Sequence, residues 1–210
     1  MEEKELQDEL SSIRSIMERS SKFISLSGLS GILAGVYALI GAGVAYLIIQ
    51  NNPLTVTKDR SFFEVLGNVV SVLLNLLIVS AAVLLVSVIT AVFLARRQAR
   101  IKGQAIWGKT SRTLLFHMLV PLLTGGALIA LFLYQGNEGF IIPAMLIFYG
   151  LALVSASNFT FGEVKYLGLL EIALGLICAC LPGYGLLFWA FGFGVLHIIY
   201  GSLMYFKYDK

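Results

Sequence analysis

Long stretches without a charged side chain alternate with short polar segments along the chain. No Asp, Glu, Lys or Arg occurs in 23–57, 65–95, 113–137, 139–162 or 172–206. A helix needs about 20 apolar residues to cross a hydrocarbon core of about 30 Å. Lipid offers no hydrogen bonds to the backbone, which favours helices for the crossing segments. The uncharged stretches therefore predict membrane-spanning helices.

The pattern predicts six spans, at about 23–49, 65–94, 113–134, 140–157, 165–181 and 185–206. A turn at Pro182-Gly183-Tyr184 divides the last uncharged stretch, which begins inside the fifth span. The expected fold is therefore all-α: a polytopic membrane helical bundle with a six-helix transmembrane domain over 23–207.

The basic residues indicate the orientation of this bundle. In the six-span topology, 13 of the 15 Lys and Arg residues fall on one side of the membrane, and Lys58 and Arg60 fall on the other side. Because cytoplasmic loops carry an excess of Lys and Arg, this split predicts that both termini lie in the cytoplasm. An odd number of spans would place the two termini on opposite sides of the membrane, and the basic residues would no longer gather on one side.

Residues 1–22 are expected to form a short cytoplasmic amphipathic helix. Leu6, Leu10, Ile13 and Met17 lie 4, 3 and 4 positions apart, which is the spacing of a heptad seam. Two interpretations remain open. The helix packs on the cytoplasmic face of its own bundle, or it pairs two copies of the chain as a short coiled coil.

Composition agrees with the membrane assignment and narrows the function. Hydrophobic residues make up 58% and charged residues 13% of the 210 positions, whereas a soluble domain has about a quarter charged residues. The sequence contains no nucleophile elbow, no phosphate-binding loop and no paired His–Glu metal motif. Cys178 and Cys180 would point to nearly opposite sides of one helix, which suits neither a disulfide nor a metal clamp. We therefore expect no enzyme activity, no metal, no cofactor and no nucleic-acid partner.

A basic segment separates the second and third spans and contains Trp107. It has two interpretations: a positive-inside loop with an interfacial tryptophan, or a contact surface for anionic lipid headgroups. Its basic residues are Arg96, Arg97, Arg100, Lys102, Lys109 and Arg112.

Small residues repeat every four positions in the first span, at Ser27, Gly31 and Gly35. Such residues let two helix backbones approach closely in lipid. The repeat predicts packing within the chain or, alternatively, a homo-oligomer formed through this span.

Two ionisable residues occupy matching places in the last hairpin. Glu171 and His197 both lie 13 residues from Tyr184, which corresponds to about 20 Å along each helix. Each has a glycine three residues before it and four after it: Gly168, Gly175, Gly194 and Gly201. We expect the fifth and sixth helices to pack glycine against glycine and to bring Glu171 and His197 together. The pair fixes the helix register, or it is a proton site that His117 extends as a candidate relay.

Two segments carry a resemblance to known sequences: Glu18–Gly31, and the last helix from Gly183-Tyr184-Gly185 to Tyr205–Tyr208. Both resemble an uncharacterised family of small bacterial six-span integral membrane proteins. The resemblance implies a bacterial plasma (inner) membrane location, and it implies no activity, ligand or catalytic residue.

The expected function is that of a non-enzymatic plasma-membrane protein that acts through packing, membrane lipids or partner contacts. The alternative is a small proton-linked transporter or channel centred on Glu171 and His197. No inverted repeat is detectable in the sequence. A cavity that reaches the pair would favour the transporter, and a dry, glycine-packed hairpin would favour the structural role.

Overall fold

The computed structural model describes residues 27–52, 62–101 and 107–209, and for 62–66 it describes the backbone alone. The expected amphipathic helix at 1–22 and the side chain of Lys102 lie outside the described residues.

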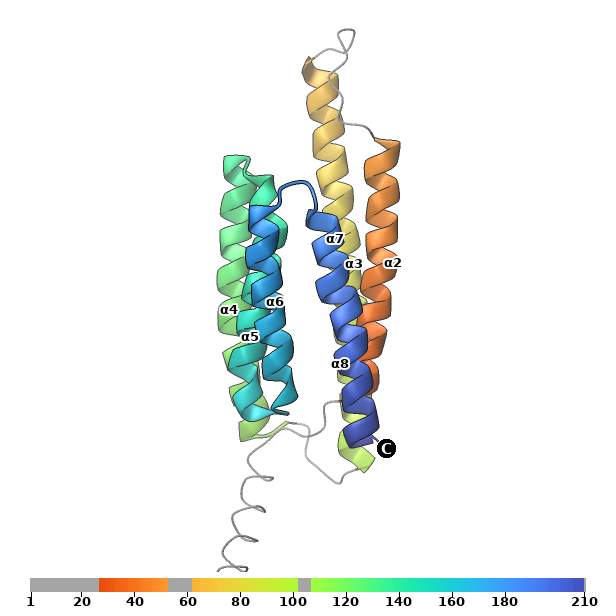
Figure 1. Cartoon of the computed structure of the whole chain (residues 1–210), viewed down its shortest axis with the longest axis vertical. Coiled ribbons are helices and arrows are strands. Elements are labelled where there is room, and N and C mark those ends of the chain that lie inside the picture. The colour runs from red at the N-terminus through yellow and green to blue at the C-terminus, as the bar shows by residue number, and fades with distance from the viewer. Residues whose placement is uncertain (1–26, 53–61, 102–106, 210) are drawn as a thin grey trace, which may run out of the picture.

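The described chain is helical and contains no strand (Figure 1). Its long helices are α2 (Gly28–Asn51), α3 (Phe62–Ile101), α4 (Lys109–Gln135), α5 (Ile141–Ala156) and α6 (Glu163–Cys180). Two 3-10 turns, η1 (Glu138–Phe140) and η2 (Ser157–Phe159), flank α5. The remainder forms one continuous helix, called the C-terminal helix below, built from α7 (Gly185–Trp189), η3 (Ala190–Leu196), α8 (His197–Met204) and η4 (Tyr205–Asp209).

Five of these helices are long and apolar enough to cross a membrane, as a multi-pass membrane protein requires. They cover Gly28–Asn51, Gly67–Ile101, Lys109–Gln135, Glu138–Phe159 and Gly185–Asp209. Helix α6 covers the fifth expected span and has 18 residues, but it carries three charged residues: Glu163, Lys165 and Glu171. Because α6 is only 18 residues long, no part of it is both long enough and apolar enough to belong with these five helices.

The helices form two groups of three (Figure 1). In the first half, α2 packs against α3 on one side and against the C-terminal helix on the other. In the second half, α5 packs against α6 and α4. The halves meet along a seam, where α5 and α6 contact the C-terminal helix. Helices α3 and α4 are not among the pairs that pack closely against each other.

Each half has a central helix, α2 or α5, that packs against the helix that follows it in the chain. The first half takes its third helix, the C-terminal helix, from the far end of the chain, whereas the second half consists of the consecutive helices α4, α5 and α6. The central helices α2 and α5 run antiparallel (Figure 1).

Glycines permit close backbone approaches between helices, and the closest of these backbone approaches lie inside each half. A Cβ atom added to Gly201 would lie 2.5 Å from the backbone nitrogen of Ile32 on α2. A Cβ atom added to Gly168 would lie 2.6 Å from the backbone oxygen of Gly150 on α5. The expectation that the fifth and sixth helices pack glycine against glycine is therefore wrong. Gly168 and Gly201 each face the central helix of their own half.

The other glycines singled out from the sequence follow the same rule. Gly31 and Gly35 of α2 face Gly201 and Gly194 of the C-terminal helix, whereas Gly175 of α6 faces α5. The glycine face of α2 is thus covered by the chain's own last helix. It is not free to contact a second copy.

The glycine contacts predict a difference between two positions on α2. A Cβ atom at Gly35 would lie 2.6 Å from the Gly194 carbonyl oxygen, whereas one at Gly43 has no neighbour within 4 Å. We expect Gly35→Ala to destabilise the fold by about 1–3 kcal/mol through overpacking. Gly43→Ala should be neutral or gain up to about 1 kcal/mol of helix propensity. Thermal unfolding in detergent measures both, and equal midpoints would contradict the packing described here.

Candidate functional site

The Glu171 carboxyl group lies in the interior of the bundle, near the middle of α6. Its side chain is 0% exposed, and Leu146 is the other large side chain buried to this degree. Neither carboxyl oxygen of Glu171 has a hydrogen-bond partner among the described residues. An ionised carboxyl at membrane depth costs about 2.5–3.5 kcal/mol even on insertion scales. The uncharged acid avoids that cost, so the protonation state of Glu171 matters to the packing around it.

His197 of the C-terminal helix lies beside this carboxyl group. Its Nδ1 atom is 3.6 Å from Oε1 of Glu171. The same Nδ1 lies 3.0 Å from the backbone oxygen of Gly192, and Nε2 lies 2.7 Å from the Tyr149 hydroxyl. A carbonyl oxygen only accepts, so Nδ1 carries the hydrogen, and Tyr149 donates to Nε2 of the neutral ring. The three side chains form a row across the seam.

A π-helical segment, η3, shapes this site. The wider turn lets His197 reach the carbonyl of the residue five positions earlier, Gly192. A Cβ atom at Gly192 would lie 2.6 Å from Oε2 of Glu171, so a larger residue here would require the carboxyl group to shift. Single-turn π segments occur frequently at functional sites. The helix distortion and the carboxyl group therefore fit each other.

The row of side chains can relay a proton. A proton that reaches Nε2 of His197 converts the ring to an imidazolium. Loss of the Nδ1 proton to a Glu171 carboxylate then returns the ring to neutral in its other tautomer. One proton has then moved from the Tyr149 side of the ring to Glu171. The 3.6 Å separation has to shorten slightly for this transfer.

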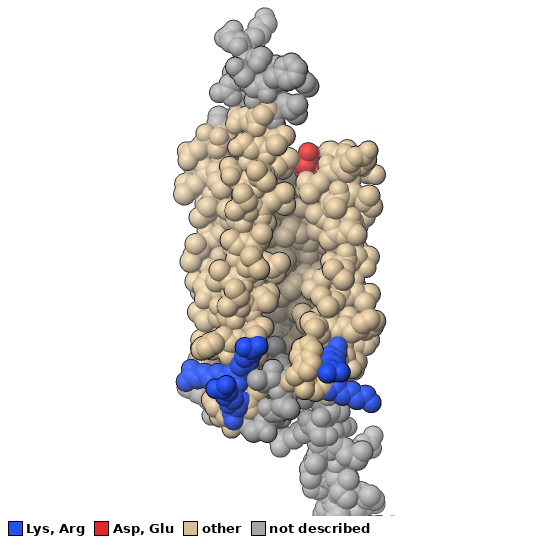
Figure 2. All heavy atoms as spheres, turned by 180° about the vertical axis from the view of Figure 1, so that it is seen from behind, with Lys and Arg blue, Asp and Glu red and all other residues tan. Residues whose placement is uncertain are grey.

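A cavity of about 420 Å³ lies between the two halves, on the Tyr149 side of this row. Tyr149 and His197 line it, together with residues of α2, α3 and α4. Glu171 is not among the lining residues and lies behind His197. Figure 2 shows the surface hollowed along the boundary between the halves. The cavity therefore reaches the polar row through Tyr149 and His197.

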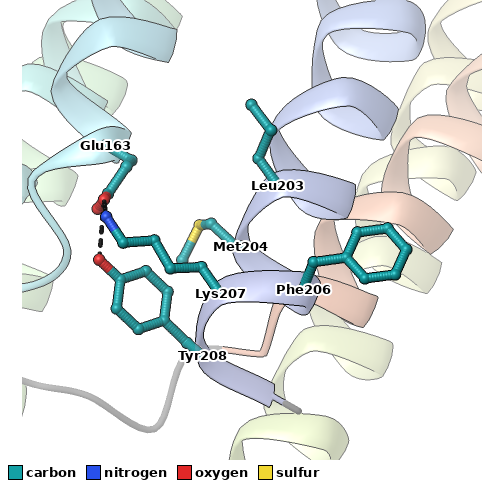
Figure 3. A pocket seen from close by; sticks show the side chains of 6 residues that line it. All are labelled: Glu163, Leu203, Met204, Phe206, Lys207 and Tyr208. Atoms are coloured by element: carbon teal, nitrogen blue, oxygen red, sulfur yellow. Dashed lines mark hydrogen bonds and ion pairs between the residues drawn. The ribbon is translucent and has the colours of Figure 1, made fainter.

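A second polar cluster joins the halves at one end of the bundle (Figure 3). Lys207 and the Tyr208 hydroxyl, both from the C-terminal helix, donate to the Glu163 carboxylate at the start of α6. The Tyr208 ring stacks on Phe161 with 4.1 Å between centroids. Partial burial raises the pKa of Glu163, but the hydrogen bonds from Lys207, its own backbone and Tyr208 outweigh this and lower the pKa below its usual value. We call this cluster the end clamp.

Asp209 forms a further connection near the end clamp, within the first half. Its Oδ2 accepts from the Ser27 hydroxyl and the Gly28 backbone, and its Oδ1 accepts from Gln98. The start of α2, the end of α3 and the end of the C-terminal helix therefore meet at one carboxylate. Sequence reasoning missed Asp209, Tyr149, Glu163 and Lys207. Glu163 and Lys207 differ in the chain by 44 positions, and nothing in the sequence indicates that they meet.

His117 lies apart from the row formed by Tyr149, His197 and Glu171. Its Nδ1 is 3.3 Å from the Ser155 hydroxyl, and its ring stacks on Phe159 at 4.7 Å. No contact observed among the described residues joins it to Glu171 or His197. The expected extension of a relay to His117 is therefore not seen in this structure, and Tyr149 occupies that place.

The basic residues gather at the end of the bundle that carries the end clamp, and the acidic atoms visible in the same view lie at the other end (Figure 2). Arg112 lies over the Trp107 ring, 5.7 Å from its centroid. The exposed members of the expected lipid-contact set are Arg96, Arg97, Arg100, Lys109 and Arg112. We call this end the basic end. Within the described ranges, no three His, Cys, Asp or Glu side chains are grouped to hold a metal ion.

Comparisons with known proteins do not assign the chain to a family. No protein-family model, no curated protein and no solved structure matches the chain. The resemblance noted from the sequence stays a prediction, and function has to be inferred from the site itself.

The end clamp generates a prediction about pH. Because the folded-state pKa of Glu163 is below its usual 4.5, the clamp stabilises the fold above that pH and loses its effect as pH falls through the folded pKa. We expect a small drop in the thermal midpoint of Glu163→Gln at neutral pH, because Lys207 is largely exposed. The drop should vanish in acid. Glu138→Gln, at an exposed carboxyl far from the clamp, serves as the control. A deficit of Glu163→Gln that persists unchanged at low pH would argue against the clamp.

Proposed function

We propose that the protein is a small proton-linked transporter, with Glu171 as the residue that binds and releases the proton. The observation that carries this proposal is the fully buried carboxyl group without a hydrogen-bond donor, 3.6 Å from a histidine at the seam between two helix groups. Ionisable residues inside membrane proteins commonly mark proton or substrate pathways. The role involves no covalent reaction, in keeping with the non-enzymatic character expected from the sequence.

The hydrogen-bond pattern favours a proton site over a purely structural pair. A polar pair that only fixes helix register is expected to satisfy both partners. His197 is satisfied through Gly192 and Tyr149, whereas Glu171 is not. A charge on Glu171 therefore weakens the packed seam, and a proton on Glu171 restores it. Proton binding and the closeness of the two halves are coupled in this way.

The architecture supplies elements that can move. Extensive glycine packing holds each half together, whereas the halves meet through fewer contacts along the seam. In many transporters, two groups of helices that rock against each other around a central site give alternating access. The end clamp closes the seam at the basic end. Opening of the clamp would expose the central site at that end.

We place the protein in the plasma membrane of a bacterium as a six-span bundle with both termini in the cytoplasm. Ser27 and Asp209 are hydrogen-bonded, so the described chain starts and finishes at the same end. The basic residues gather at this end, which supports its assignment to the cytoplasm. Helix α6 counts as the fifth crossing, because its central charge faces the bundle interior instead of lipid.

Lipid contact is a second role that one observation favours. Five exposed basic residues at the ends of α3 and α4 suit anionic headgroups. This contact is compatible with transport, since it would anchor the basic end without involving the seam. A homo-oligomer formed through the segment 1–22 remains a prediction, because that segment lies outside the described residues.

Proton uptake into proteoliposomes tests the proposed function. Under an imposed membrane potential, with a pH-sensitive dye inside the vesicles, we expect uptake above that of empty vesicles. Glu171→Gln should reduce uptake to that background, because an amide cannot bind and release the proton. Glu138→Gln, an exposed carboxyl at the opposite end, should keep the parental rate. Equal uptake by Glu171→Gln and the parent, or none by the parent, would refute the proposal.

Cross-linking of the two halves tests the motion. In a chain with Cys178→Ala and Cys180→Ala, we would introduce Glu163→Cys and Lys207→Cys and bridge them with a short cleavable thiol reagent. Uptake should stop after bridging and return after cleavage, because the basic end can then open again. Each protein is compared with itself, so any effect of losing the end clamp cancels. Unaltered uptake by the bridged protein would exclude movement at this end.

A further inference from the structure

The cavity between the halves has the composition of a ligand site for an uncharged molecule. Its volume of about 420 Å³ lies in the range of small-molecule pockets. None of its described lining residues is an Asp, Glu, Lys or Arg. The polar side-chain groups in its wall belong to Ser80 and Ser87 of α3 and, on the opposite side, to Tyr149, His197 and the indole N–H of Trp189. A charged molecule would find no counter-charge in this wall.

The cavity opens between α3 and α4, halfway along both helices. Residues 77–87 of α3 and 122–129 of α4 form its rims, and these two helices do not pack closely against each other. Leu84 on one rim is 64% exposed, and Gly126 on the other rim is exposed too. At this depth a six-span protein is surrounded by hydrocarbon. A molecule that enters here comes from the bilayer, so it has to be lipophilic.

The inner wall of the cavity is aromatic. Phe193 lies 5.5 Å from Trp189 and 5.1 Å from Tyr149 between ring centroids. All three rings line the cavity. Aromatic rings favour other rings at such distances, in stacked or edge-on arrangements. This wall therefore suits a ring-bearing molecule better than a flexible alkyl chain.

One hydrogen-bonding group at the inner wall has spare capacity. The Tyr149 hydroxyl donates its only hydrogen to His197, which leaves its oxygen able to accept. A ligand hydroxyl or N–H group that donates to this oxygen would complete the row that ends at Glu171. A lipid acyl chain has no such donor, which disfavours it as the occupant.

We propose that the cavity binds a lipophilic, uncharged, ring-bearing molecule with a hydroxyl or N–H donor, which enters from the bilayer between α3 and α4. The biological role of this binding rests on the proposed transport function, whereas the binding itself can be measured without transport. The space is ample, because an engineered cavity of about 150 Å³ already holds one benzene. The ligand's donor contacts Tyr149, and through it the molecule is linked to the proton on Glu171.

The chain allows a direct measurement of this binding. It has two tryptophans, and Trp107→Phe leaves Trp189, in the cavity wall, as the single fluorophore. Full-length protein in lipid nanodiscs would be titrated with 3,5-dibromophenol, whose bromine atoms quench tryptophan on contact, at a mildly acidic pH that keeps the phenol uncharged. The probe 3,5-dibromoanisole has the same ring and bromine atoms without the donor. We expect saturable quenching by the phenol, and binding of the anisole about 3- to 10-fold weaker, the value of one hydrogen bond.

Matched variants locate the binding. Gly126 lines the cavity, and a Cβ atom added there has no neighbour within 4 Å, so Gly126→Leu is designed to fill the opening. Gly43 on α2 has the same open space and does not line the cavity. Gly126→Leu should abolish saturable quenching, and Gly43→Leu should preserve it. Tyr149→Phe should weaken the phenol to the level of the anisole and leave anisole binding unchanged.

Several results would overturn the inference. Quenching that rises linearly with both probes would show only partition into the bilayer. Lipids with brominated acyl chains would also be tested. If they quench Trp189 and the phenol does not displace them, the occupant of the cavity is an acyl chain. Equal affinities for both probes in the parent would remove the role of the Tyr149 hydroxyl.

The result also separates this inference from the proposed function. Saturable binding without proton uptake would refute transport and leave the ligand site standing. Proton uptake abolished by Glu171→Gln, together with only linear quenching, would leave transport standing and refute the ligand class.

Discussion

The central constraint on this structure is the free energy of one carboxyl group held away from water and from hydrogen-bond donors. A charge on Glu171 is costly in that place, and a neutral acid is not. The surrounding features fit this group: Gly192 leaves space for its oxygen, the π segment brings the Gly192 carbonyl to His197, and Tyr149 satisfies the far side of the ring. The protonation state of Glu171 therefore affects the free energy of the contact between the halves, which apolar side chains also stabilise.

Packing is distributed unevenly around that group. Backbone approaches at glycines hold α2 against the C-terminal helix and α5 against α6. The seam relies instead on side chains: an apolar cluster that joins Leu153 and Leu167 to Leu196, the polar row in the middle, and the end clamp at the basic end. Van der Waals packing drives helix association in lipid, so the close backbone contacts at the glycines stabilise each half. The buried carboxyl group lies at the seam, where a change in its charge alters the packing energy.

Much of this architecture was accessible from the sequence, and the limits are physical. Gaps between charged residues located the helices, since lipid excludes charge. The equal distances of Glu171 and His197 from the turn at Tyr184 indicated a common depth, and the structure places them 3.6 Å apart. The helix that each glycine faces could not be predicted, because that depends on how the six helices are ordered around the bundle. Tyr149 was missed for the same reason: its helix, α5, had to be known to lie at the seam.

The packing of α2 against the C-terminal helix has a consequence for biogenesis. During synthesis α2 and α3 enter the bilayer well before the C-terminal helix, whose Gly194 and Gly201 cover the small-residue face of α2. Until that last segment leaves the ribosome, Gly31 and Gly35 remain in contact with lipid or with an insertion factor. The second half, made of consecutive helices, can assemble earlier. The packing of the first helices to be synthesised is therefore completed last.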